Sequence, residues 1–315
     1  MQKKEIQGIR NFNEMWFRSC FYHQRMAALS RYGVPFEYTI LNYEEKINVQ
    51  TNSPLHLMIA RSILSEREEQ GLFGVRTICE ERDDLIDYLI AKIDLGQPVM
   101  VAQDHFYLPY RRNYYLQEHG AHYVLIYGYD KKDKMFMAGE SNFINGYDYG
   151  KKRIPMEVVE KSYQSFRLVL KKEQCGPLYR FVKCRRRSLA QRLRILEKME
   201  QNFRERDYIV YVRLYDLLLQ KPLPTEELLV FESPVVSLTT YFRILLEQLK
   251  LLFNCKAVNQ MIEYVWRQAG IVKGLLVKAI LKGDPEIFFT DNTRKFVAQI
   301  KHGLQTLNEW IWKRK

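Results

Sequence analysis

The sequence predicts an α+β protein, in which helices precede an antiparallel sheet and a mostly α-helical domain follows. Two observations predict this class. Apolar residues recur at helical spacing up to about residue 96 and then alternate with a period of two up to about residue 154. Beyond that point nearly every segment returns to helical spacing. Separate runs of helices and strands are typical of α+β domains.

Three helices are expected before the sheet, over residues 20–32, 53–70 and 77–96. Ser19 is in place to cap the first helix, and Gly33 lies just past its end. Ser53-Pro54 supplies a cap and a first-turn proline for the second helix. Thr77-Ile-Cys-Glu80 has the spacing of a capping box, which predicts the start of the third helix.

The strand pattern begins at Pro98. The clearest strand is His122-Tyr-Val-Leu-Ile-Tyr127, a run rich in β-branched and aromatic residues that leads into a turn over 128–133. Further strands are expected over 98–102, 135–138 and about 146–154, and one more over 176–183. Short strands joined by turns predict antiparallel pairing.

Five helical segments are expected in the second half of the chain. They cover residues 155–166, 188–219, 234–254, 257–282 and 291–313, with breaks at Pro222, Pro224, Pro234 and Gly283-Asp-Pro285. The period changes near residues 170–185, where the basic run Lys183–Arg187 begins. We therefore expect two domains, 1–175 and 176–315.

The composition is that of an ordinary globular protein. Of the 315 residues, 47% are hydrophobic and 27% are charged, which excludes collagen-like, low-complexity and fully disordered chains. The net charge of +12 is unevenly distributed. Residues 1–160 carry 20 basic and 22 acidic side chains, whereas residues 161–315 carry 29 and 15. Attraction to an acidic partner would therefore act through the second half.

Compartment and redox state follow from what the sequence does not contain. The five cysteines are scattered and show no CxxC spacing, so neither a disulfide framework nor a structural zinc site is expected. The charged N-terminal segment lacks the apolar core of a secretory signal. No run of about 18 uninterrupted apolar residues is present, so we expect a cytoplasmic protein without a membrane span.

Cys20 is the first candidate for chemistry. It stands at the N-terminus of the first predicted helix, where free backbone N–H groups and the helix dipole stabilise a thiolate. A nucleophilic cysteine needs such a position because the thiolate is its reactive form. The alternative is a small buried hydrophobic side chain, which is the commonest role of a free cysteine.

His122 and Glu140 are the candidate partners of this thiol. His122 begins the clearest strand, at the sheet edge, where an imidazole can face a thiolate from a separate helix. Glu140 follows the next strand, and alternation places it on one face with Phe136 and Ala138. A carboxylate there can accept the far imidazole N–H and complete a nucleophile–base–orienter chain. The alternatives are a structurally bonded or solvent-facing histidine and a solvated carboxylate.

Three segments together resemble the N-terminal family of butirosin biosynthesis protein H. They are FRSCFYHQRMAALSRYG, GQPVMVAQDHFYLPY and HGAHYVLIYGYDKKDKMFMAGESNF, and the resemblance covers about residues 10–170. That family is similar in fold to papain-like proteins and to the peptidases that remove double-glycine leader peptides. The resemblance implies a papain-like N-terminal domain.

The resemblance also implies acyl transfer in the biosynthesis of natural products such as nonribosomal peptides, polyketides or aminoglycosides. The founding member moves an aminoacyl group from a carrier-protein thioester to an amine. By position, Cys20 would be the nucleophile, His122 the base and Glu140 the orienting carboxylate. The thioester would sit on the phosphopantetheine of an acidic acyl or peptidyl carrier protein, and no cofactor of the protein's own is implied.

Two positions depart from the family pattern. Asp or Asn usually stands at the place of Glu140, so Asn142 is an alternative orienting residue. Papain-like enzymes often carry a Gln as oxyanion donor six residues before the nucleophile, where this chain has Glu14. The backbone N–H of Cys20 would need a different second donor, for which Asn13 is a candidate.

The segment Gln103–Tyr110 supplies candidate substrate contacts. Asp104 either orients an amine or accepts backbone N–H groups of a turn. Tyr107 and Tyr110 are expected to shape a pocket wall.

Two further histidines are weaker candidates. His23 follows Cys20 by three residues and ranks below His122 as a base. His119 and His122 have a spacing seen in metal sites, but no further ligand accompanies them, so no metal is expected.

The sequence thus favours an acyltransferase that works through Cys20 on a small-molecule amine acceptor. The alternatives are a cysteine peptidase or amidase that uses water, and a catalytically inactive scaffold or binding member of the pathway. The basic run that begins at Lys183 could contact phosphates, but no aromatic-interleaved motif accompanies it, so nucleic acid is not the expected partner. The helical domain would cover the cleft, recruit the carrier protein or form a homo-oligomer.

Overall fold

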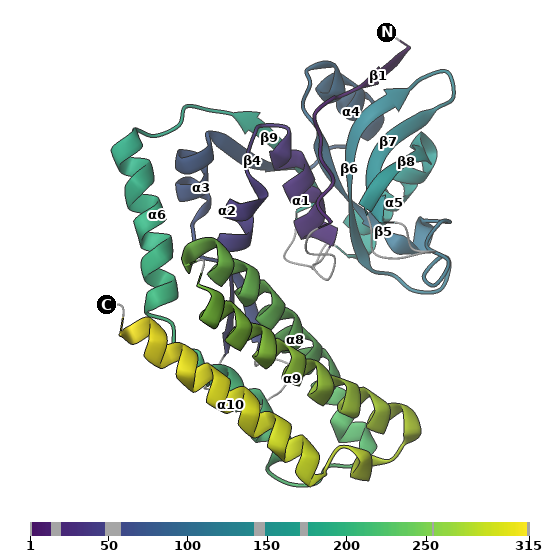
Figure 1. Cartoon of the computed structure of the whole chain (residues 1–315). Helices are drawn as coiled ribbons and strands as arrows, with labels where there is room; N and C mark the ends of the chain where they lie inside the picture. Colours follow the sequence, from purple (N-terminus) through teal and green to yellow (C-terminus); the bar gives the residue numbers. More distant parts are fainter. Residues whose placement is uncertain are drawn as a thin grey trace. The chain divides into compact units, whose positions relative to one another are not determined.

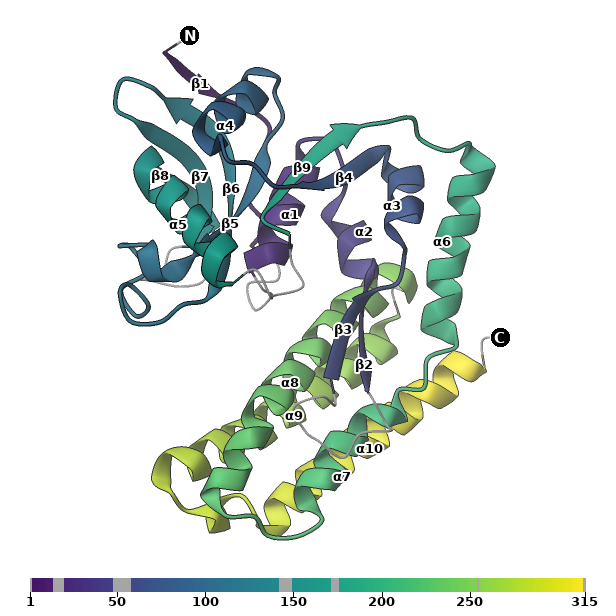
Figure 2. The same cartoon turned by 180° about the vertical axis from the view of Figure 1, so that it is seen from behind.

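The computed structural model describes residues 2–13, 20–47, 58–141, 149–170, 176–253 and 255–313. The chain divides into two compact units, which Figures 1 and 2 show from opposite sides. The first unit comprises Met1–Phe36 and Ser65–Arg192, and the second comprises Glu37–Leu64 and Leu193–Lys315. The predicted α+β class is confirmed, with an antiparallel sheet followed by a helical C-terminal region.

The first unit is built on a seven-stranded antiparallel sheet in the order β4-β9-β5-β6-β7-β8, with β1 paired to β6. Its strands are β1 (Lys3–Glu5), β4 (Val75–Glu80), β5 (Val99–Asp104), β6 (Ala121–Asp130), β7 (Met135–Ser141), β8 (Tyr149–Pro155) and β9 (Leu178–Lys183). Strands β5 to β8 follow one another in both the chain and the sheet. Every residue of β5 is buried, which makes this strand part of the core.

Helices cover this sheet. They are α1 (Cys20–Ser30), α3 (Glu66–Phe73), α4 (Leu85–Asp94) and α5 (Met156–Val169), with the 3-10 turn η2 (His105–Tyr107) after β5. Helix α1 packs against β6 and β5, and α5 packs against β5. The first turn of α1 is therefore held next to the strands at the centre of the sheet.

Two predicted helices differ from the structure. Within the expected helix 53–70, residues 58–62 form strand β3 and only Glu66–Phe73 is helical, while 53–57 lies outside the described residues. In place of the expected start at Thr77, β4 runs to Glu80, and α4 begins at Leu85. Strand β4 pairs with β9, about a hundred residues later, and this pairing outweighs the local capping signal.

A capping box does occur, at Ser65. The backbone N–H of Glu68 donates to Ser65 Oγ (3.3 Å), and Glu68 Oε2 accepts from the backbone N–H of Ser65 (2.8 Å). This pair fixes the start of α3.

The units also divide the chain differently from the expected domains 1–175 and 176–315. Strand β9 lies between β4 and β5, so residues 176–192 belong to the first unit. Residues 37–64 belong to the second unit, together with the C-terminal helices. Sheet order and long-range packing, which no local period reveals, decide both assignments.

The second unit is mainly helical. Its helices are α7 (Arg213–Leu219), α8 (Thr225–Phe253), α9 (Lys256–Lys282) and α10 (Asp291–Trp312), with the 3-10 turns η3 (Ile209–Val212) and η4 (Pro285–Ile287) and the strand pair β2 (Tyr43–Ile47) and β3 (Met58–Ser62). Helices α2 (Phe36–Leu41) and α6 (Leu189–Arg204) each cross from one unit into the other. Helix α9 packs against both α8 and α10, as Figure 1 shows. The expected break at Pro234 is wrong, because α8 continues through that proline.

Helix α8 is long and apolar enough to cross a membrane by length and composition. Of the 18-residue window that meets this test, 56% is buried inside the protein. The helix also packs against α9 along its length and buries the polar side chain of Gln248. These contacts are those of a core helix.

Gln248 of α8 holds residues 37–47 onto the helices. Its Nε2 donates to the carbonyl oxygens of Ile40 (2.8 Å) and Tyr43 (2.6 Å), and the side chain has no exposed surface. Gln248→Leu leaves both carbonyl oxygens buried without this donor, so it should lower the free energy of unfolding by about 2 kcal/mol. Urea denaturation followed by circular dichroism measures the loss. Gln260→Leu, at an exposed position of α9, is the control, and equal effects of the two would contradict the assignment.

Candidate active site

Cys20 is the first residue of α1 and is partly exposed. The ring of Phe21 lies edge-on to Tyr123 of β6, with centroids 5.1 Å apart, which ties the start of the helix to the start of the strand. The first-turn N–H groups of a helix have no partners inside the helix, so they favour an anion at this position. Ser19, the expected N-cap, lies outside the described residues.

His122 and Glu140 lie on the neighbouring strands β6 and β7. The register pairs Leu125 with Gly139, so alternation turns His122 and Glu140 to the same face of the sheet. His122 Nε2 is 2.8 Å from Glu140 Oε2. Both side chains are buried, with 3% and 0% of the residue exposed. The structure thus brings the expected imidazole and carboxylate together.

The thiol of Cys20 completes this chain of contacts. Its side chain is hydrogen-bonded to His122 and to the backbone of Tyr123. Since Glu140 occupies Nε2 of the imidazole, Nδ1 is the ring nitrogen that remains for the sulfur. The three residues are far apart in sequence but adjacent in the fold, in the order thiol, imidazole, carboxylate.

The electrostatics of the three groups favour a thiolate. Burial by itself would raise the pKa of the Cys20 thiol, but His122, the two hydrogen bonds and Arg111 together hold that pKa below its ordinary value. Burial would lower the pKa of His122, yet Glu140 and Cys20 hold it above its ordinary value. A thiol with a lowered pKa beside an imidazole with a raised pKa is what a thiolate–imidazolium pair requires.

Arg111 is a site residue that no pattern in the sequence singles out. Its Nη2 lies 2.7 Å from Glu140 Oε1, 2.7 Å from His122 Nε2 and 3.0 Å from Ser141 Oγ. Only 6% of the residue is exposed, whereas the next residue, Arg112, is exposed. No period or motif in the sequence distinguishes these two arginines, so only the fold identifies the buried one.

Glu140 is held as an anion. Besides His122 and Arg111, the backbone N–H of Ser141 donates to its Oε1 (2.6 Å). Burial alone would raise the pKa of this carboxyl, but these partners lower it to about 2. The longer Glu side chain therefore reaches the imidazole with normal hydrogen-bond geometry. Asn142, the alternative orienting residue, lies outside the described residues.

Tyr110 and Tyr107, the two residues expected to shape a pocket wall, have different neighbours from each other. Tyr110 donates a hydrogen bond to Glu140 Oε2 (3.3 Å), and the ammonium of Lys152 lies 5.2 Å from its ring centroid. The ring of Tyr107 contacts the ammonium of Lys161 at 4.6 Å. Tyr110 therefore adds a neutral donor to the carboxylate.

Asp104 anchors the loop between β5 and β6. Its carboxylate accepts from the backbone N–H groups of Phe106 (3.1 Å) and Gly120 (3.1 Å) and from Ser165 Oγ (2.7 Å), and it lies 2.6 Å from His119 Nδ1. These contacts match the alternative in which Asp104 holds a turn. The loop that it fixes carries Arg111.

His23 and Asn13 both have structural contacts. His23 Nδ1 is 2.6 Å from the carbonyl oxygen of Phe12, and its ring stacks on Tyr149 with centroids 4.3 Å apart. Asn13 Oδ1 accepts from the backbone N–H of Tyr149 (2.7 Å), and its Nδ2 donates to the Tyr149 carbonyl (3.2 Å). Asn13 is thus bound to β8, and Glu14 lies outside the described residues.

In the part of the chain that the structure describes, no group of three or more His, Cys, Asp or Glu residues is arranged to hold a metal ion. His119 faces Asp104, whereas His122 faces Glu140. The two histidines therefore have separate carboxylate partners.

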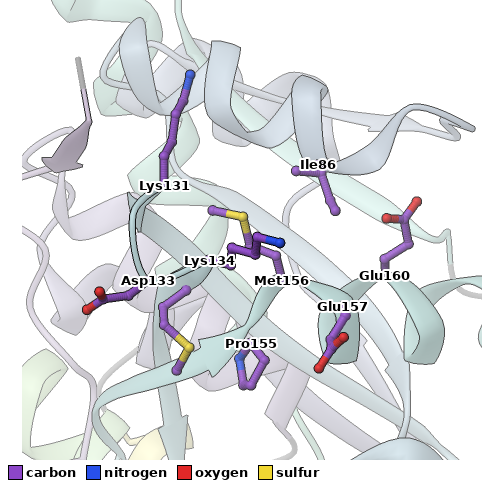
Figure 3. A pocket seen from close by; sticks show the side chains of 9 residues that line it. Ile86, Lys131, Asp133, Lys134, Pro155, Met156, Glu157 and Glu160 are labelled. Atoms are coloured by element: carbon purple, nitrogen blue, oxygen red, sulfur yellow. The ribbon is translucent and has the colours of Figure 1, made fainter.

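A cavity of about 690 Å³ lies elsewhere in the first unit, between α4, the turn after β6 and the start of α5 (Figure 3). Ile86, Met135, Pro155 and Met156 give it an apolar part, and Lys131, Asp133, Lys134, Glu157 and Glu160 bring charges to it. None of Cys20, His122 and Glu140 lines this cavity.

The fold and the site define an α+β protein with a thiol, an imidazole and a carboxylate in hydrogen-bonded sequence. The family model described as butirosin biosynthesis protein H, N-terminal, matches residues 62–138. The match is to the family that the sequence resembles, and it includes His122 and Arg111 but neither Cys20 nor Glu140. No curated protein matches the chain.

The lowered pKa of Glu140 predicts a pH-dependent contribution to stability. Its carboxylate stabilises the fold above the ordinary carboxyl pKa of 4.5, and this stability is lost as the pH falls toward about 2. Glu140→Gln should therefore lower the free energy of unfolding at pH 7 by about 3 kcal/mol, with a difference from wild type that shrinks between pH 4.5 and 2. Urea titrations at several pH values measure this difference.

Glu118→Gln, at an exposed position, is the matched control and should leave the free energy of unfolding at pH 7 close to that of wild type. A loss of stability in Glu140→Gln that stays constant down to pH 2 would contradict an ionised, charge-paired Glu140.

Proposed function

We propose that this protein transfers an acyl or aminoacyl group from a carrier-protein thioester, through a covalent thioester on Cys20, to an amine in natural-product biosynthesis. The observation that carries the proposal is the hydrogen-bonded order of Cys20, His122 and Glu140. The match to the butirosin biosynthesis protein H family supports the same class of pathway. Cys20 would be the nucleophile, His122 the base and Glu140 the carboxylate that orients it.

The chemistry balances with these groups alone. The Cys20 thiolate attacks the thioester carbonyl, a new C–S bond forms, and the pantetheine sulfur leaves with the proton from the His122 imidazolium. The acceptor amine then attacks the acyl-Cys20 carbonyl and gives a proton to neutral His122. The C–N bond forms, and Cys20 leaves as the thiolate beside an imidazolium. First-turn N–H groups of α1 would stabilise the oxyanion in both steps.

Buried polar groups beside His122 have no hydrogen-bond partner among the described residues. Gln103 pairs with His122 across β5 and β6 and has no exposed surface. Among the described residues, neither end of the Gln103 amide nor Nε2 of His105 has a hydrogen-bond partner. Buried groups of this kind are normally satisfied.

The acyl donor would be an acidic acyl or peptidyl carrier protein with its phosphopantetheine. The acyl acceptor would be a small-molecule amine. The excess of 29 basic over 15 acidic side chains in residues 161–315 supports an acidic protein partner. Such carrier proteins act in the cytoplasm, where we place this protein.

The proposal predicts an acyl-enzyme. Incubation with an aminoacyl-N-acetylcysteamine thioester should add the mass of one acyl group to Cys20, as intact and peptide mass spectrometry would show. Cys20→Ser should lose thioester formation at this position, whereas Cys79→Ser, at an exposed cysteine, should keep it. Absence of acylation in the wild-type protein with several donors would contradict the proposal and favour the scaffold alternative.

Addition of an amine separates transfer from hydrolysis. Transfer predicts that the acylated Cys20 decays faster with the amine and yields the amide. Release of free acid at a rate independent of the amine would instead identify a hydrolase.

A further inference from the structure

The Nη2 nitrogen of Arg111 has three polar neighbours within hydrogen-bonding distance, but it carries only two hydrogens. Nη2 lies 2.7 Å from Glu140 Oε1, 2.7 Å from His122 Nε2 and 3.0 Å from Ser141 Oγ. A guanidinium Nη carries two hydrogens and cannot accept. Glu140 Oε1 and Ser141 Oγ take both hydrogens, because both are oxygen acceptors at normal distance. His122 Nε2 therefore lies beside Arg111 as a second donor to the same carboxylate, which it reaches through Oε2 (2.8 Å).

This arrangement also balances the charge of the site. With Cys20 as thiol and His122 neutral, Glu140 is paired by Arg111. Transfer of the proton from Cys20 to His122 adds one negative and one positive charge. The net charge of these four side chains is zero in both states, so proton transfer leaves no uncompensated charge in a buried site.

We propose that Arg111 is the positioning residue that keeps His122 in its Nε2–H form, with Nδ1 as the base toward Cys20, and that keeps the site neutral while the proton moves. Arg111 acts through Glu140 and need not touch the substrate. This inference rests on the proposed function, since it assigns the basic nitrogen of that reaction.

Other titratable groups also face the site. They are His105 of η2, Tyr110 of the following loop, and Tyr149 and Lys152 of β8. The pKa of each tyrosine is raised by burial, so both stay neutral in the working range, and burial lowers the pKa of His105. Burial also lowers the pKa of Lys152, whose ammonium donates to the Ser141 carbonyl (2.9 Å). All of these groups are retained in the Arg111 and Arg112 variants, so a difference between those variants reports on the arginine that was changed.

Removal of the Arg111 charge should shift the pKa values of Cys20 and His122 in the same direction. The guanidinium lowers the pKa of the Cys20 thiol because it stabilises the thiolate, and it lowers the pKa of His122 because it opposes the imidazolium. Without it, both should rise. The rising and falling limbs of the thiolate–imidazolium profile should then move together to higher pH.

The test is the pH dependence of Cys20 alkylation by iodoacetamide between pH 4 and 10, resolved by mass spectrometry. Arg111→Gln should move both midpoints up by about one pH unit, and Arg111→Lys, which keeps the charge, should move them less. Arg112→Gln, at the exposed neighbour, is the matched control and should move neither. A purely structural arginine would change the folded fraction, and hence the amplitude, without moving a midpoint.

A measurement on the wild-type protein accompanies the variants. Nitrogen-15 NMR of His122 should show Nε2 protonated across the pH range while Nδ1 titrates. A neutral His122 with an unprotonated Nε2 would overturn the inference, and so would unchanged midpoints in a folded Arg111→Gln variant. If that variant does not fold, the NMR result on the wild-type protein decides. If wild-type Cys20 itself behaves as an ordinary thiol, the proposed function fails, which is a separate outcome.

Discussion

The buried carboxylate of Glu140 is the group on which the rest of the site depends. A carboxylate without exposed surface is costly unless it is paired and hydrogen-bonded. Here His122, Arg111 and the backbone N–H of Ser141 supply those partners. Each of them is in turn fixed by Glu140, so the imidazole has one orientation and its other nitrogen is directed to Cys20.

The sheet makes this convergence possible. Strands β6 and β7 are neighbours in chain and sheet, so His122 and Glu140 meet through a short turn. Cys20 comes from a helix about a hundred residues earlier, which packs on β6. The loop after β5, anchored by Asp104, brings Arg111 back over the same strands. Rigid strands thus hold the base and the carboxylate, while a helix terminus holds the thiol.

Much of this arrangement could be predicted from the sequence, because it rests on local signals. Alternation from Pro98 onward predicts β5, β6 and β7. The alternation of side chains along the strand that follows His122 also makes Glu140 the candidate carboxylate partner of His122. Other features depend on distant pairing. Residues 77–80 carry a capping pattern, yet they form part of β4 and pair with β9 in the sheet. Arg111 has the same local sequence properties as Arg112, and only the fold of the loop buries one of them.

The most direct test of the account is the reactivity of Cys20 compared with the other cysteines. Iodoacetamide labelling across pH, resolved by mass spectrometry in wild type and His122→Ala, needs no knowledge of the substrate. We expect Cys20 alone to label rapidly well below a pH of about 8.5, the ordinary thiol pKa, and His122→Ala to remove this advantage. A Cys20 that labels like Cys79 and Cys255 in both proteins would contradict a thiolate–imidazolium pair.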